Sequence, residues 1–162
     1  MSHPGGLIDD FVDLLLAFEE HEVDYVVVGA HAVAAAGVVR ATKDLDVFVR
    51  PSASNAVRIM RALVAFGAPI AAHGVRAADF ATPGVVYQMG LPPRRIDITT
   101  AIDGVSFEEA SRGAVRQRVD DLDLPFLGLR ELLMTKRAAG RPQDLADIDH
   151  LSRVGTSQPD TP

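Results

Sequence analysis

The stretch that decides the fold runs from Tyr25 to Arg50 and reads YVVVGAHAVAAAGVVRATKDLDVFVR. The valine run near its start predicts a strand over Asp24–Val28, because β-branched side chains favour extended backbone. Gly29 then permits a sharp turn. The alanine-rich residues 30–37 predict a short helix that can lie close to a sheet. A second strand is predicted over Asp44–Val49, so the stretch forms a strand–turn–helix–strand unit.

Two acidic residues of the second strand, Asp44 and Asp46, lie two positions apart, so their carboxylates share one face of the sheet. Neighbouring carboxylates repel each other, and aspartate is a poor strand residue. A divalent cation such as Mg²⁺ offsets this repulsion because it prefers carboxylate oxygens. Thr42 and Lys43 add a hydroxyl and a positive charge suited to phosphate, and Gly29 adds backbone N–H groups at a helix start. The stretch therefore predicts a metal and phosphate site.

A third carboxylate follows in a predicted hairpin. Val85–Met89 and Arg95–Thr99 predict two strands whose prolines are confined to the turn between them. The second strand carries Asp97 between two isoleucines. Given the aspartate pair, Asp97 is a candidate general base, or a ligand of the metal ion nearest an attacking hydroxyl. The alternative is a single acid at a strand edge, paired with Arg94 or Arg95.

The C-terminal part adds positive charge to the predicted site. Leu129–Ala139 predicts one helix, and Pro142 starts a second helix that ends near Leu151. Lys136 and Arg141 are placed to reach a phosphate across a cleft, although a solvated helix lysine is the alternative for Lys136. Asp144 lies in the first turn of the second helix, where the helix dipole favours negative charge, so simple capping is the alternative to a functional role.

Two groups of residues carry a resemblance to a known family. The first is Val28-Gly29-Ala30, a spacer with Arg40, Thr42 and Lys43 at its end, and Asp44-Leu45-Asp46-Val47. It resembles the hG[GS]…Dh[DE]h pattern of the nucleotidyltransferase superfamily that includes DNA polymerase β. The second is Lys136, Gly140-Arg141-Pro142, Asp144 and Asp147. Together they are most similar to the AbiEii-type minimal nucleotidyltransferases of bacterial toxin–antitoxin systems.

The resemblance implies transfer of a nucleoside monophosphate from a nucleoside triphosphate (NTP) to an acceptor hydroxyl. It implies two Mg²⁺ ions on Asp44, Asp46 and Asp97. The implied nucleotide-binding residues are Gly29, Ala30, Arg40, Thr42, Lys43, Lys136, Arg141 and Asp144. The implied acceptor is tRNA or protein, and the implied partner is an antitoxin protein.

One residue departs from the family pattern and keeps other functions open. Ala30 stands where the family has Ser or Gly, so a serine hydroxyl for phosphate is absent and only a backbone N–H remains. A non-catalytic nucleotide-binding or interaction domain of the same fold is therefore one alternative. A small-molecule acceptor, as in antibiotic-modifying relatives, is another.

The whole chain sets the remaining expectations. Its 162 residues predict one domain over 1–152 and a disordered tail over 153–162. The fold is expected to be α/β, with a mixed, twisted sheet of the nucleotidyltransferase type, flanking helices and a short C-terminal helical part that closes a cleft. The formal net charge of −6 argues against duplex-DNA binding. No apolar run is long enough for a membrane span, no export signal is evident and there is no cysteine, so a cytoplasmic protein is expected.

The other elements follow from turn and capping residues. Helices are predicted over Leu7–Glu20, from Ser52 or Ser54 to Phe66 with Val57 and Val64 on the buried face, and from a capping box at Ser106. Strands are predicted within Ala114–Val119 and Leu124–Leu127, while 68–80 predicts a short strand or a loop.

Overall fold

The structure is a computed structural model that describes residues 9–29, 32, 44–92, 94–119 and 121–157. The predicted helix over 30–37, apart from Ala32, lies outside these residues. So do four of the implied nucleotide-binding residues, Ala30, Arg40, Thr42 and Lys43.

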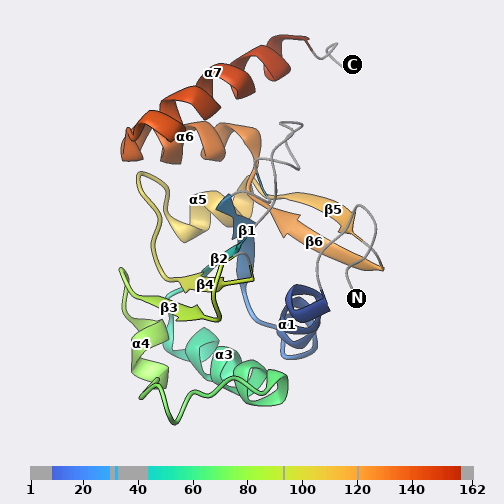
Figure 1. The fold of residues 1–162 in the computed structure, drawn as a ribbon, viewed down its shortest axis with the longest axis vertical. Coiled ribbons are helices and arrows are strands. Elements are labelled where there is room, and N and C mark those ends of the chain that lie inside the picture. The colour runs from blue at the N-terminus through green and yellow to red at the C-terminus, as the bar shows by residue number, and fades with distance from the viewer. Residues whose placement is uncertain (1–8, 30–31, 33–43, 93, 120, 158–162) are drawn as a thin grey trace.

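A six-stranded mixed sheet forms the centre of the molecule, with strand order β3-β4-β2-β1-β6-β5 (Figure 1). The strands are β1 (Tyr25–Val28), β2 (Leu45–Val49), β3 (Val86–Met89), β4 (Ile96–Thr99), β5 (Val115–Val119) and β6 (Leu122–Phe126). Strand β1 runs antiparallel to β2 and parallel to β6, and β2 runs parallel to β4. The α/β class is therefore confirmed. The order also confirms that the strand before Gly29, the aspartate strand and the Asp97 strand are neighbours.

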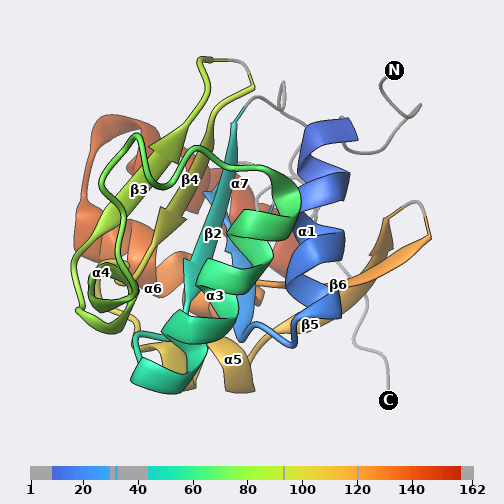
Figure 2. The ribbon, with the colours of Figure 1, turned by 90° about the horizontal axis from the view of Figure 1, so that it is seen from below.

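Helices cover both faces of this sheet. They are α1 (Asp9–Glu20), α3 (Ala53–Phe66), α4 (Ala77–Ala81), α5 (Phe107–Arg112), α6 (Leu129–Ala139) and α7 (Pro142–Ser157). Figure 2 shows α1 and α3 side by side over one face, with α6 and α7 on the opposite side. No helix within the described ranges is long and apolar enough to cross a membrane.

Alternation along the strands divides the core into two clusters. In β2, Leu45, Val47 and Val49 are fully buried in the cluster beneath α1 and α3. Phe48 points to the other face, where its ring meets Phe107 of α5 with centroids 5.2 Å apart. Asp46 shares this second face, so the acidic residue lies next to the end of a buried cluster.

Capping residues explain where the helices begin and end. Ser52 accepts a hydrogen bond from the Asn55 backbone at the start of α3, and Gly67 ends that helix in the left-handed conformation at φ 92°. Ser106 forms the predicted capping box of α5. Gly140 adopts φ 65° after α6 and reverses the chain into α7. The predicted hairpin is also confirmed, because β3 and β4 pair antiparallel.

Two expectations about helices are wrong. Helix α7 reaches Ser157, so the predicted disordered tail over 153–162 is helical up to 157; the rest of it lies outside the described residues. The ion pair from Arg153 to Asp149, one turn earlier, supports this extension.

On α3, Val57 and Val64 are 44% and 64% exposed. The buried face carries Ala56, Ile59, Ala62 and Leu63 in place of these two valines. The expected strand or loop over 68–80 is correct only in part: residues 68–76 form turns, whereas 77–80 belong to α4.

Candidate active site

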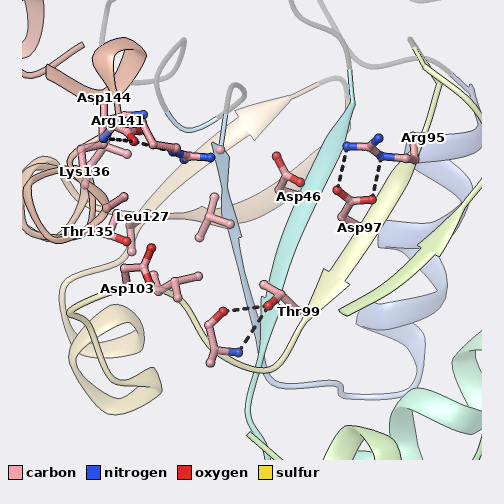
Figure 3. A pocket seen from close by; sticks show the side chains of 16 residues that line it. Asp46, Arg95, Asp97, Thr99, Asp103, Leu127, Thr135, Lys136, Arg141 and Asp144 are labelled. Carbon is pink, nitrogen blue, oxygen red and sulfur yellow. Dashed lines mark hydrogen bonds and ion pairs between the residues drawn. The ribbon is translucent and has the colours of Figure 1, made fainter. Parts of the chain in front are cut away.

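A cavity of about 430 Å³ lies next to the ends of β1 and β6 and the start of β2, and extends along β4 to the residues that follow it. It is lined by Val28, Gly29, Asp46, Arg95, Asp97, Thr99, Ala101, Ile102, Asp103, Leu127, Leu132, Thr135, Lys136, Ala139, Arg141 and Asp144. Figure 3 shows acidic side chains of the sheet on one side and polar side chains of α6 and α7 on the other. The cavity thus joins the sheet end that carries the aspartates to the C-terminal helices.

The centre of the sheet side is a pair of carboxylates. Asp46 and Asp97 occupy paired positions on the neighbouring parallel strands β2 and β4, so their side chains lie next to each other. Burial, followed by the charge of Asp97 and a hydrogen bond with it, raises the pKa of Asp46 to about 7. The charge of Asp44 acts in the same direction. Asp46 therefore holds a proton more tightly than an isolated aspartate would.

Gly29 makes room for the Asp46 carboxylate. Asp46 pairs with Val28, the last residue of β1, and the chain turns immediately afterwards at Gly29 with φ +71°. A Cβ at this position would overlap Oδ2 of Asp46. The glycine is therefore required twice, for its left-handed backbone and for the close approach of the carboxylate.

Arg95 is the main counter-ion of these acids. Its Nε and NH2 donate to Oδ1 and Oδ2 of Asp97 at 2.9 and 3.2 Å. Its NH2 also lies 3.5 Å from Oδ2 of Asp44, and its backbone N–H donates to Oδ1 of Asp44 at 3.1 Å. The alternative partner proposed for Asp97 from the sequence is therefore present. Asp44 adjoins the cavity through Arg95.

A second charged network lies on the helical side. The Lys136 ammonium is buried, 2.9 Å from Oδ2 of Asp147 and 3.6 Å from Oδ1 of Asp144. Gln143 donates a further hydrogen bond to Asp147 at 2.9 Å. Since both aspartates are also buried, the lysine joins α6 to α7 through a compact set of paired charges. The position of Lys136 is thus not that of a solvated helix lysine.

Arg141 and Asp144 form the rim of this network. Nε of Arg141 donates to Oδ2 of Asp144 at 2.6 Å, and the Arg141 side chain is 75% exposed. Hydrogen bonding from Arg141 holds the pKa of Asp144 below its usual range, against the effect of burial. Asp144 also accepts from the Arg141 backbone N–H at 3.2 Å, which is the capping role considered from the sequence.

The structure therefore brings together most of the described candidates. Gly29, Asp46, Asp97, Lys136, Arg141 and Asp144 line one cavity, and Asp44 adjoins it. Sequence reasoning missed Asp103, Thr99 and Thr135 as lining residues, and it considered Arg95 only as an alternative partner of Asp97. A charged residue two positions before Asp97 on the same strand points to the same face, and this spacing was the available signal for Arg95.

The acidic side suits a hard divalent cation by its chemistry. Asp44, Asp46 and Asp97 offer only carboxylate oxygens, and the left-handed turn at Gly29 leaves Asp46 space that a Cβ would fill. In the described part of the chain, no three His, Cys, Asp or Glu side chains lie together in a way that could hold a metal ion. In this arrangement Arg95 is hydrogen-bonded to Asp97. Carboxylate oxygens are the ligands that Mg²⁺ prefers, and Arg95 binds two of these three carboxylates in the structure.

Comparison of the chain with known protein families found no match. A comparison with curated proteins found none either.

Proposed function

We propose that this chain is a metal-dependent nucleotidyltransferase of the superfamily that includes DNA polymerase β. The observation that carries the proposal is the pairing of Asp46 with Asp97 on neighbouring parallel strands, at the wall of a 430 Å³ cavity. The Gly29 turn lies against the first of these carboxylates. A cavity of this volume falls in the range of small-molecule sites, which is about 300–1,000 Å³.

Asp46 and Asp97, with Asp44 beside them, are the residues that would hold Mg²⁺. Bound Mg²⁺ would supply neutralisation of phosphate charge and a lower pKa of the acceptor hydroxyl. The acceptor oxygen forms a bond to the α-phosphorus of the NTP, and the bond from that phosphorus to the bridging oxygen breaks. Pyrophosphate leaves with the electron pair. Asp97 is the proposed base that takes the hydroxyl proton.

On the helical side, the structure favours Arg141 over Lys136 as the phosphate-binding residue. The Arg141 guanidinium is largely exposed at the cavity rim, whereas the Lys136 ammonium is buried between two aspartates. Lys136 is better explained as a positioning residue that fixes α6 against α7. The further parts of the proposal, a tRNA or protein acceptor and an antitoxin partner as in AbiEii-type systems, rest on the sequence resemblance.

The test is transfer of label from each α-labelled NTP, with Mg²⁺, to total RNA or to a protein extract. We expect transfer by the wild type and its loss in Asp46→Asn and Asp97→Asn. Asp123→Asn is the matched control, because this exposed aspartate of β6 pairs with Arg116 and does not line the cavity. Equal transfer by the wild type and both active-site variants would refute the proposed active site.

A nucleotide-binding domain without transferase activity is the second candidate. The observation that favours it is Arg95, which already occupies Asp97, the proposed base. This candidate predicts that nucleotide and Mg²⁺ bind and that Asp46→Asn weakens this binding. It also predicts that no label reaches any acceptor in the extract. Equilibrium dialysis with labelled NTP, run beside the transfer assay, separates the two functions.

A further inference from the structure

Arg95 has a position that the proposed chemistry leaves unexplained. Its guanidinium binds Asp97 through two hydrogen bonds and lies 3.5 Å from Asp44. These are two of the three carboxylates proposed to hold divalent cations. A guanidinium and a divalent cation carry the same sign of charge and seek the same oxygens, so they compete for this position.

The Arg95 side chain is able to move while its backbone stays in place. The backbone is fixed to the neighbouring chain segment on both sides, since its N–H donates to Asp44 at 3.1 Å and its carbonyl accepts from Leu45 N–H at 2.9 Å. The side chain is 33% exposed and lines the cavity. Figure 3 shows its guanidinium over the Asp97 carboxylate, joined to it by two hydrogen bonds. A rotamer change is therefore sufficient to withdraw the guanidinium from both aspartates, while Asp44 keeps its hydrogen bond from the Arg95 backbone N–H.

We propose that Arg95 is a phosphate-binding residue of the nucleotide site that covers the carboxylates until a polyphosphate, arriving with divalent cations, draws it away. This inference rests on the proposed function. Without nucleotide, Arg95 offsets the repulsion among the clustered acids. A phosphate group offers the planar guanidinium the same two-oxygen geometry as a carboxylate. Transfer of Arg95 to phosphate frees Asp97 and Asp44 for cations.

The consequence is coupling between two ligands through one side chain. A bound cation displaces Arg95 and makes it available to phosphate, and bound phosphate removes Arg95 from the cation site. By linkage, each ligand raises the affinity for the other by the same factor. Arg95 would then disfavour cation binding at the empty site and favour it once the polyphosphate is present.

The first measurement is Mn²⁺ binding to the protein without nucleotide. Binding is detected as a decrease in the electron paramagnetic resonance signal of free Mn²⁺. Arg95→Gln removes the competing charge, so we expect Mn²⁺ to bind about tenfold more tightly than to the wild type. Arg94→Gln is the matched control, because Arg94 is an exposed arginine in the adjacent position. We expect it to change the affinity by less than about twofold, as for other exposed charges.

The second measurement is binding of inorganic tripolyphosphate by calorimetry, at Mg²⁺ concentrations that saturate every variant. Arg95→Gln should weaken this binding about tenfold, because a charge-assisted pair is lost. Arg95→Lys keeps the charge without the planar fork and should give intermediate values in both measurements. A misfolded variant would lose both ligands, so changes of opposite sign identify the exchange.

Unchanged or weaker Mn²⁺ binding by Arg95→Gln would overturn the inference about Arg95. The proposed metal centre is tested separately by Asp46→Asn and Asp97→Asn, which should lose Mn²⁺. If both aspartate variants bind Mn²⁺ as the wild type does, the proposed function loses its metal centre whatever Arg95 does. Failure of the wild type and Arg95→Gln alike to bind Mn²⁺ overturns both.

Discussion

Replacement of Asp46 by asparagine should stabilise the fold at alkaline pH. The gain should equal the free-energy cost of keeping this buried carboxylate ionised. Burial and the neighbouring Asp97 raise the pKa of Asp46 from its ordinary value of 3.8 to about 7. The folded state therefore binds a proton more tightly than the unfolded state does. Its free energy of unfolding must fall as pH rises between these two values and then stay low above the higher one.

The magnitude follows from the difference between the folded and unfolded pKa. Each pKa unit corresponds to about 1.36 kcal/mol, so the full penalty for ionised Asp46 is about 4 kcal/mol. Burial is the largest cause of this penalty, and the charge of Asp97 adds to it. We expect Asp46→Asn to raise the free energy of unfolding by about 2–4 kcal/mol at about pH 8, and to leave it nearly unchanged at about pH 4.

The assay is urea unfolding of the wild type and Asp46→Asn at both pH values, with a chelator present to remove divalent cations. Asp123→Asn, at an exposed position, should change the free energy of unfolding by at most about 1 kcal/mol at either pH. A variant that is no more stable than the wild type at the higher pH would refute the reasoning. So would an equal gain at both pH values, because that gain could not come from ionisation of Asp46.

Three further predictions concern separate parts of the structure, and each is tested by urea unfolding. Asn55→Ala should cost about 3 kcal/mol, since the fully buried amide makes three hydrogen bonds to backbone groups at 2.8, 3.0 and 3.0 Å; a loss below about 1 kcal/mol would contradict this. Gly29→Ala should lower the free energy of unfolding by at least about 1–2 kcal/mol, because alanine is strained at the positive φ of this position. The added Cβ should also displace Asp46 and weaken Mn²⁺ binding. Unchanged Mn²⁺ affinity would disprove the close contact between Gly29 and Asp46. Lys136→Met should lower the free energy of unfolding by about 3–5 kcal/mol, because it leaves two buried carboxylates without their lysine. Arg141→Gln, at an exposed position, should lower it by less than about 1 kcal/mol. Equal losses would argue against the buried network.

Local patterns in the sequence were sufficient to predict the sheet side of the site. The two-residue period of a strand places Leu45 and Val47 in the core and leaves Asp46 on the other face. The hairpin that carries Asp97 and the turn at Gly29 follow from short-range backbone preferences in the same way. These predictions succeed because each depends on a few consecutive residues.

The remaining features depend on packing between distant segments. Two apolar stripes run along α3, and packing against α1 and α4 buries the stripe with Ala56 and Ala62 and leaves Val64 exposed. The burial of Lys136 between acids of α7 depends on the angle at which two helices meet after Gly140. Neither the choice of stripe nor that angle is determined by residue spacing.

The balance of charge in the cavity gives the acidic cluster and Arg95 a common explanation. Among the described residues in and around the cavity, the acids are Asp44, Asp46, Asp97, Asp103, Asp144 and Asp147, and the bases are Arg95, Lys136 and Arg141. A polyphosphate adds several further negative charges, and these described bases are already paired with acids. Such a ligand is repelled unless it brings cations or takes a base from its present partner. Arg95 is the base whose exchange would also serve the cations, because its departure exposes the carboxylates that they require.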